Sequence, residues 1–308
     1  MSDAPVAIAT PPSHRGLPFE HAIYVLSPFG LLPTTIILFI VLFGTFLAIA
    51  SAEGVSVVRH SGEAFSFSDA GWPALVLSLL CCTAMAMQRY VRLAEAREVS
   101  SYAAILSGGM ASALAITSVA PSEARLGRAT LIGILIGAVL SVVVRVAEFR
   151  EGHYIPPGTM AWFALATILL MVLFVRGAEQ SRAGAHSYGE LLRKELKVDL
   201  LRTDTLSVLG RAGARHALIW FVVSAVACLF FMSGDLNWLT VLLIVGCAAM
   251  GVALFAAAMV RIHHQIMEAK SAELERIRCR IDALRDKLHE DAFASASLHG
   301  LLAYEKRV

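Results

Sequence analysis

The sequence predicts an all-α membrane protein: a six-span helical bundle with a cytoplasmic C-terminal helix. Of its 308 residues, 57% are hydrophobic and only 16% are charged, and the mean hydropathy is +0.68. Soluble domains carry about 25% charged residues, so this composition is typical of a membrane protein. The net charge of +2 gives no reason to expect nucleic-acid binding.

Six apolar stretches supply the predicted spans, and they carry no charge apart from Arg145. A helix of about 20 residues crosses a hydrocarbon core of about 30 Å, and slightly shorter stretches can cross with their flanking residues. The predicted spans are Leu31–Ala50, Trp72–Met87, Thr130–Ala147, Met160–Val175, Ala217–Met232 and Trp238–Met259.

The chain before, within and after these spans divides into three parts. Residues 1–30 form a cytoplasmic N-terminal segment, which is no cleavable signal peptide because no basic region precedes an apolar core. Residues 31–260 form the membrane domain, with a basic cytoplasmic loop at 176–216. Residues 261–308 form a cytoplasmic helical tail.

The distribution of basic residues sets the predicted orientation. Ser100–Val119 is also uncharged and long enough to span, but it is rich in Ser and Ala and is interrupted by Gly108 and Gly109. If it does not span, 23 of the 26 Lys and Arg residues lie on one side. The positive-inside rule then places both termini in the cytoplasm. Ser100–Val119 is therefore expected to be a surface or re-entrant helix.

The tail repeats apolar residues at alternating spacings of three and four. The members of this stripe, called the tail seam below, are Leu274, Ile277, Ile281, Leu284 and Leu288. Such spacing is typical of a short coiled coil, which predicts either a homodimer or the docking of a partner helix. The alternative is a lone amphipathic helix that packs on the loop Arg176–His216, and both interpretations stay open.

Two further patterns predict contacts with helices and with lipid. Gly133 and Gly137 form a G-x-x-x-G motif, whose small residues let two membrane helices approach closely, either within one subunit or in a dimer. Arg193, Lys194 and Lys197 lie beside leucines that recur every four residues. This arrangement predicts a basic amphipathic helix on an anionic lipid surface.

The residues that could carry chemistry have simpler explanations. Arg145 could line an ion path, but it lies near enough to the interface to snorkel, and Glu148 can neutralise it. His60 with Glu63, and Glu148 with Glu151 and His153, lack a fixed metal-binding geometry. The five cysteines form no C-x-x-C pair, and the chain holds no nucleotide-binding or hydrolase motif. No catalytic residue, metal or cofactor is therefore predicted.

Three segments resemble a group of uncharacterised proteobacterial polytopic inner-membrane proteins. They are Lys197–Leu201, which reads K-V-D-L-L, Gly213–Trp220, and His263–Ile277 with its A-K-x-x-E-L pattern. The resemblance covers most of residues 190–308 and carries no assigned activity. Members of the group continue past the position of Tyr304–Val308 into hydrophobic sequence, which implies that this chain is a short form.

The sequence favours a non-enzymatic membrane scaffold or signalling component that associates through its C-terminal helix. A channel or transporter acting through the six-span bundle is the alternative. An enzyme is not expected, because the longest segments outside the spans hold only about 40–50 residues, too few for an ordinary catalytic domain.

Overall fold

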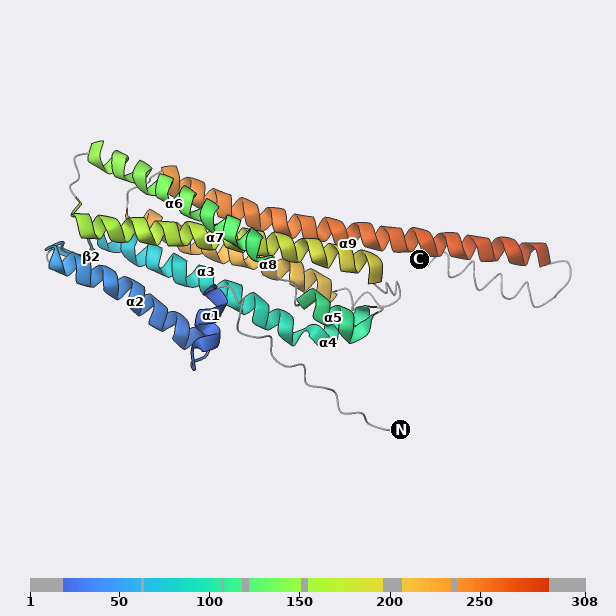
Figure 1. Cartoon of the computed structure of the whole chain (residues 1–308). Coiled ribbons are helices and arrows are strands. Elements are labelled where there is room, and N and C mark those ends of the chain that lie inside the picture. Colours follow the sequence, from blue (N-terminus) through green and yellow to red (C-terminus); the bar gives the residue numbers. More distant parts are fainter. Residues whose placement is uncertain are drawn as a thin grey trace. The chain divides into compact units, whose positions relative to one another are not determined.

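The computed structural model describes residues 19–61, 64–106, 108–117, 122–150, 155–195, 207–233 and 238–287 (Figure 1). The helices are α1 Phe19–Leu26, α2 Leu31–Ala52, α3 Gly71–Arg97, α4 Val99–Ile105, α5 Gly109–Thr117, α6 Glu123–Arg150, α7 Pro157–Glu195, α8 Ser207–Ala227 and α9 Trp238–Lys287. A 3-10 helix, Cys228–Ser233, follows α8, and two short strands, β1 Val58–Ser61 and β2 Ala64–Phe67, follow α2.

Five helical segments of this structure are long and apolar enough to cross a membrane. They are Leu31–Ala52, Gly71–Arg97, Glu123–Ala147, Pro157–Gly184 and Gly213–Met232. The predicted class, a helical membrane protein, is therefore confirmed at this level. The sixth predicted span lies in α9, whose apolar described part, Val241–Ala257, is shorter than the other five.

The all-α prediction missed a small β-hairpin between α2 and α3. β1 and β2 pair antiparallel, with Val58 opposite Phe67 and Ser61 opposite Ala64. Four residues per strand give too little alternation for a sequence pattern to reveal. Gly71 starts α3 immediately after the hairpin, and a side chain there would collide with the Val57 carbonyl. A glycine is thus required where the hairpin meets the helix.

The ambiguous segment Ser100–Val119 forms two short helices in its described part. α4 has 7 residues and α5 has 9, whereas a span needs about 20. The chain turns between them at Gly109, whose φ of +59° lies in the left-handed region that favours glycine. Neither helix can cross a membrane alone, as the charge distribution predicted.

The segment 176–216, expected to be a basic cytoplasmic loop, is helical in its described part. α7 continues without a break to Glu195, and α8 already begins at Ser207. Most of this segment is therefore helical extension of two spans. The physical reason is composition, because Arg176–Glu195 contains no Pro and many good helix formers. Arg193 and Lys194 lie on the last turn of α7, with side chains outside the description, and Lys197 lies outside the described residues.

The predicted span Trp238–Met259 and the first part of the predicted helical tail form one continuous helix, α9, which has 50 residues. At 1.5 Å per residue it is about 75 Å long. Within the tail seam, Ile277 is only 3% exposed, while Leu274 and Ile281 are half-buried. The Leu284 side chain and all of Leu288 lie outside the description.

The chain divides into two compact units. Unit 1 comprises the described residues of Met1–Tyr90, Pro121–Glu179 and Leu229–Leu236. Unit 2 comprises those of Val91–Ala120, Gln180–Cys228 and Asn237–Val308.

In unit 1, α7 packs against both α2 and α6. Trp162 of α7 lies against Phe46 of α2, with ring centroids 5.0 Å apart. On the α6 side, a Cβ built at Gly133 would lie 2.6 Å from Val172 Cα, and one at Gly137 would lie 2.6 Å from Ile168 Cα. The G-x-x-x-G motif thus faces a helix of its own chain, and its glycines bring the two backbones together.

The close approach of α6 and α7 gives a direct test. Gly137→Val should lower the free energy of unfolding by about 1–3 kcal/mol or more, because the backbone of Ile168 leaves no room for a side chain. Gly44→Val is the matched control, since Gly44 lies in the apolar helix α2 with nothing within 4 Å of an added Cβ. Thermal unfolding in detergent micelles measures both, and equal shifts would contradict the packing described.

Candidate functional site

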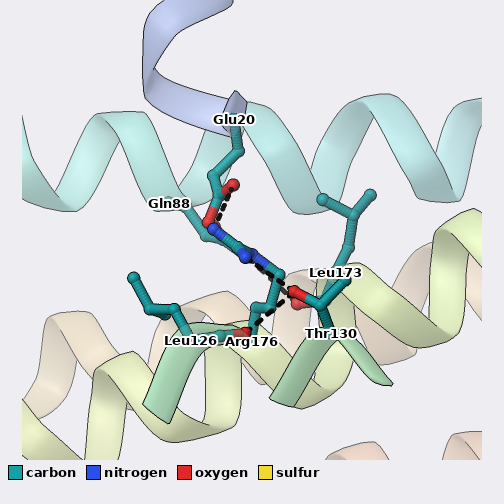
Figure 2. Close-up of polar contacts among 6 residues, drawn as sticks. All are labelled: Glu20, Gln88, Leu126, Thr130, Leu173 and Arg176. Carbon is teal, nitrogen blue, oxygen red and sulfur yellow. Dashed lines mark hydrogen bonds and ion pairs between the residues drawn. The ribbon is translucent and has the colours of Figure 1, made fainter. Parts of the chain in front are cut away.

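The most deeply buried charges of unit 1 lie where α1, α6 and α7 meet (Figure 2). Glu20 of α1 is 0% exposed and Arg176 of α7 is 7% exposed. Arg176 Nε and Nη2 donate to the two carboxylate oxygens of Glu20 at 3.2 and 3.1 Å. Arg176 Nη1 donates to Thr130 Oγ1 of α6 at 2.8 Å, and Thr130 donates onward to the Leu126 carbonyl.

This two-pronged pairing explains how the bundle tolerates a buried guanidinium. An Arg–carboxylate fork is among the strongest charge-assisted hydrogen bonds, and it offsets part of the cost of removing both charges from water. The Phe19 ring adds a cation–π contact, with Arg176 Cζ 5.1 Å from its centroid. The cluster therefore fastens the short helix α1 to two membrane helices.

Gln88 of α3 lies beside the same stretch of α7. Its Nε2 donates to the Leu173 carbonyl at 3.2 Å, as Figure 2 shows. Its Oε1 is buried and finds no hydrogen-bond partner among the described residues. Gly177 makes room for the amide, because a Cβ there would lie 2.9 Å from Gln88 Nε2. Four helices thus contribute polar groups near one end of the α7 span.

A carboxylate holds the other end of α7. Glu53, directly after α2, accepts the backbone N–H of Gly158 at 2.6 Å and that of Thr159 at 2.7 Å. It also accepts the Thr159 hydroxyl at 2.7 Å. These donors belong to the first turn of α7, where N–H groups lack helical partners and the helix dipole favours negative charge. Burial raises the pKa of Glu53, but the Thr159 and Gly158 hydrogen bonds outweigh it and leave the pKa below its ordinary value.

Unit 2 contains its own charged cluster, which joins the end of α3 to α8. Arg215 pairs with Glu98, and His216 Nε2 lies 3.3 Å from Glu95 Oε1. Tyr102 of α4 is 1% exposed and donates its hydroxyl to Glu98 at 3.5 Å. These contacts pair two carboxylates with Arg215 and His216 of a neighbouring helix, so this cluster also acts as a joint between helices.

The structure describes the side chains of only some of the candidate residues that the sequence suggested. Arg145 Nη1 is buried and has no hydrogen-bond partner among the described residues, and the side chain of its expected partner Glu148 is not described. His60 has no described side chain, and Glu63, Glu151 and His153 lie outside the described residues. Where side chains are described, no group of three or more His, Cys, Asp or Glu residues could hold a metal ion.

Sequence reasoning missed the residues that form these joints. Arg176 was assigned to a loop and Glu20 to an N-terminal segment, yet they form the most buried ion pair among the described side chains. One local signal was available, because Arg176 directly follows the apolar stretch Met160–Val175 without a helix breaker. Its partner could not be identified, since 156 positions separate the two residues.

The buried pair predicts an asymmetric response to mutation. Arg176→Met leaves the Glu20 charge buried and unpaired, which should lower the free energy of unfolding by about 3–5 kcal/mol. Adding Glu20→Met should recover most of that loss, because an apolar pair of similar volume replaces both charges. Thermal unfolding of both variants in detergent measures this.

The exposed pair Arg276–Glu273 on α9 supplies the control. Arg276→Met should change the unfolding free energy by no more than about 1 kcal/mol. An Arg176→Met variant as stable as the wild type would contradict the role given to the buried pair.

Glu53 predicts a pH dependence of known sign. Its pKa is lower in the folded state than the ordinary 4.5, so the folded state binds fewer protons. The stabilisation is therefore complete above the ordinary pKa and is lost as the pH falls through the folded pKa. As the pH falls from 6 to 3, the melting temperature of the wild type should fall more steeply than that of Glu53→Gln. Glu268→Gln, at an exposed position, should follow the wild type; identical slopes for all three would exclude the effect.

No protein-family model matches this chain, and no curated protein or solved structure matches it. The resemblance to proteobacterial inner-membrane proteins stays a prediction.

Proposed function

We propose that the protein is a multi-pass membrane scaffold or signalling component that associates through its C-terminal helix. One observation carries the proposal: α9 is a single helix of 50 residues whose first half is apolar and whose second half is charged. A helix of this kind couples a membrane anchor rigidly to a polar rod. The Glu20–Arg176 and Glu98–Arg215 clusters favour the scaffold, because their charges pair with each other and hold helices together.

The apolar half of α9 is fixed to α8 within unit 2. Ser224 Oγ donates to the Ile244 carbonyl at 3.1 Å. A Cβ built at Gly251 would lie 3.3 Å from the Ala217 carbonyl and from the Phe221 ring, so the two helices approach closely there. Past this contact α9 carries exposed charged residues, including Glu268, Glu275 and Arg276. The charged half therefore extends from a firmly packed base.

The proposed topology has six spans, with the apolar half of α9 as the sixth and both termini in the cytoplasm of a bacterial inner membrane. The positive-inside rule supports it, since 23 of 26 basic residues then share one side. The contacts of unit 1 agree with alternating spans. Gln88 and Thr130 meet one end of the α7 span, near Leu173 and Arg176, while Glu53 meets the other.

Two kinds of partner follow from this topology. The lipid bilayer covers the apolar helix faces, and anionic head groups are the proposed partners of Arg193, Lys194 and Lys197. The tail seam is the proposed site for a second copy of this chain or for a partner helix. Leu274, Ile277 and Ile281 continue one stripe along α9, as a coiled coil requires.

A double substitution in the tail seam tests the proposal. Ile277→Asp with Leu284→Asp places two charges where a partner helix would bury apolar side chains, which should abolish association of so short a coil. The variant should still insert, because the proposed spans precede it. Light scattering of detergent-solubilised protein and pull-down from native membranes measure association.

The matched control adds the same charges at the same spacing on the other face of α9. Ala272→Asp with Cys279→Asp changes two exposed residues and should leave association intact. If the seam variant keeps the mass and bound proteins of the wild type, the tail is no association element.

A channel or transporter is the second candidate. Gln88 Oε1 and Arg145 Nη1 are buried in membrane helices without hydrogen-bond partners among the described residues, and polar groups inside a membrane mark transport paths in many proteins. Ion flux into proteoliposomes that is lost in Gln88→Leu would favour this candidate over the scaffold.

A further inference from the structure

The side of α6 that faces away from α7 carries a continuous stripe of exposed apolar residues. At about 100° per residue, this side lies opposite Gly133 and Gly137, which contact the α7 backbone. The members of this stripe, called the α6 stripe below, are Leu131, Ile132, Leu135, Val139, Val142 and Val146. An exposed apolar surface of this extent marks a contact with lipid or with another protein helix.

Two arginines stand at the start of the α6 stripe. Arg125 and Arg128 are exposed, lie one turn apart and belong to the same side of the helix as the stripe. Neither has an ion-pair partner among the described side chains. Glu123, the nearest carboxylate in the sequence, lies on the opposite side of α6. The start of the stripe is therefore positively charged.

The length of the stripe matches the thickness of a membrane. Arg150 is exposed on the same side of α6, 22 positions after Arg128, which corresponds to about 33 Å along the helix. The hydrocarbon core of a bilayer is about 30 Å thick, so the arginines reach the head-group level at both ends. Arg150 stands between Glu148 and Glu151 in the sequence, so the end with Arg125 and Arg128 has the higher positive charge.

Charge and residue size both favour lipid over a second copy of the chain on this surface. Two copies have the same orientation in a membrane, so a symmetric contact through the α6 stripe would bring Arg128 close to its own copy, and likewise Arg150. Like charges in an interface oppose association. Membrane helices also associate preferentially through small residues, and the glycines of α6 face α7 instead.

We propose that α6 binds an anionic phospholipid, with the phosphate held by Arg125 and Arg128 and the acyl chains along Leu131, Ile132 and Leu135. The two arginines are about 4.5 Å apart along the helix axis, so both can reach one phosphate. A guanidinium group donates two parallel hydrogen bonds to such an anion. A zwitterionic lipid carries an ammonium group of its own, which the arginines repel. This site goes beyond the proposed function, because it does not depend on association of the tail.

Fluorescence quenching in vesicles tests the site on the full chain. The protein carries a bimane fluorophore on Leu135→Cys, its only cysteine, in phosphatidylcholine vesicles. A minor fraction of the lipid is either phosphatidylglycerol or phosphatidylcholine with brominated acyl chains, which quench the fluorophore on contact. The affinity for phosphatidylglycerol should exceed that for phosphatidylcholine about tenfold or more, because two arginines attract the anionic head group. In Arg125→Gln/Arg128→Gln this ratio should fall to about one.

The matched control removes the same two charges elsewhere. Arg276→Gln with Arg280→Gln changes two exposed arginines of α9 and should keep the affinity ratio of the wild type. A ratio near one in the wild type, or an unchanged ratio in Arg125→Gln/Arg128→Gln, overturns the proposal.

Two further outcomes identify other occupants and also overturn the proposal. If neither brominated lipid quenches the fluorophore, a protein helix covers the α6 stripe. If inorganic phosphate abolishes the preference at constant ionic strength, the arginines bind a free anion and the acyl chains add nothing.

Discussion

A charge buried among membrane helices has to be neutralised by another charge, and this constraint organises unit 1. Arg176 follows the apolar span of α7 and is only 7% exposed, and the fully buried carboxylate of Glu20 offsets its charge. Meeting that need fixes α1 against α7 and, through Thr130, against α6. At the opposite end, Glu53 satisfies the first N–H groups of α7. The apolar span of α7 is thus held at both of its ends by residues from other elements.

Features that depend on neighbouring residues could be predicted from the sequence. The apolar stretches, the interruption at Gly108–Gly109 and the unbroken helix of α9 are all set by local composition, and the structure contains them. The joints between helices could not be predicted. Glu53 and Thr159 lie 106 positions apart, and which carboxylate reaches which helix end depends on how the spans pack. The extension of α7 and α8 into the segment 176–216 was not expected, although Arg and Lys are good helix formers.

The charged joints and the tail seam are proposed to have different roles. Arg176 and Arg215 each have a carboxylate partner and join helices within their own unit. The tail seam is different, because it is a stripe of apolar residues on the charged half of α9. Burying such apolar surface against a complementary helix is favourable, because it removes the surface from water.

Everything proposed for the tail depends on which side of the membrane it occupies. Single-cysteine variants carrying Ser61→Cys, Ser187→Cys or only the native Cys279 test this with a membrane-impermeant thiol reagent on intact cells. The six-span topology predicts that Ser61→Cys is labelled from outside, and that Ser187→Cys and Cys279 react only after the cells are opened. Labelling of Cys279 from outside would show that α9 leaves the membrane on the other face and would contradict a cytoplasmic tail.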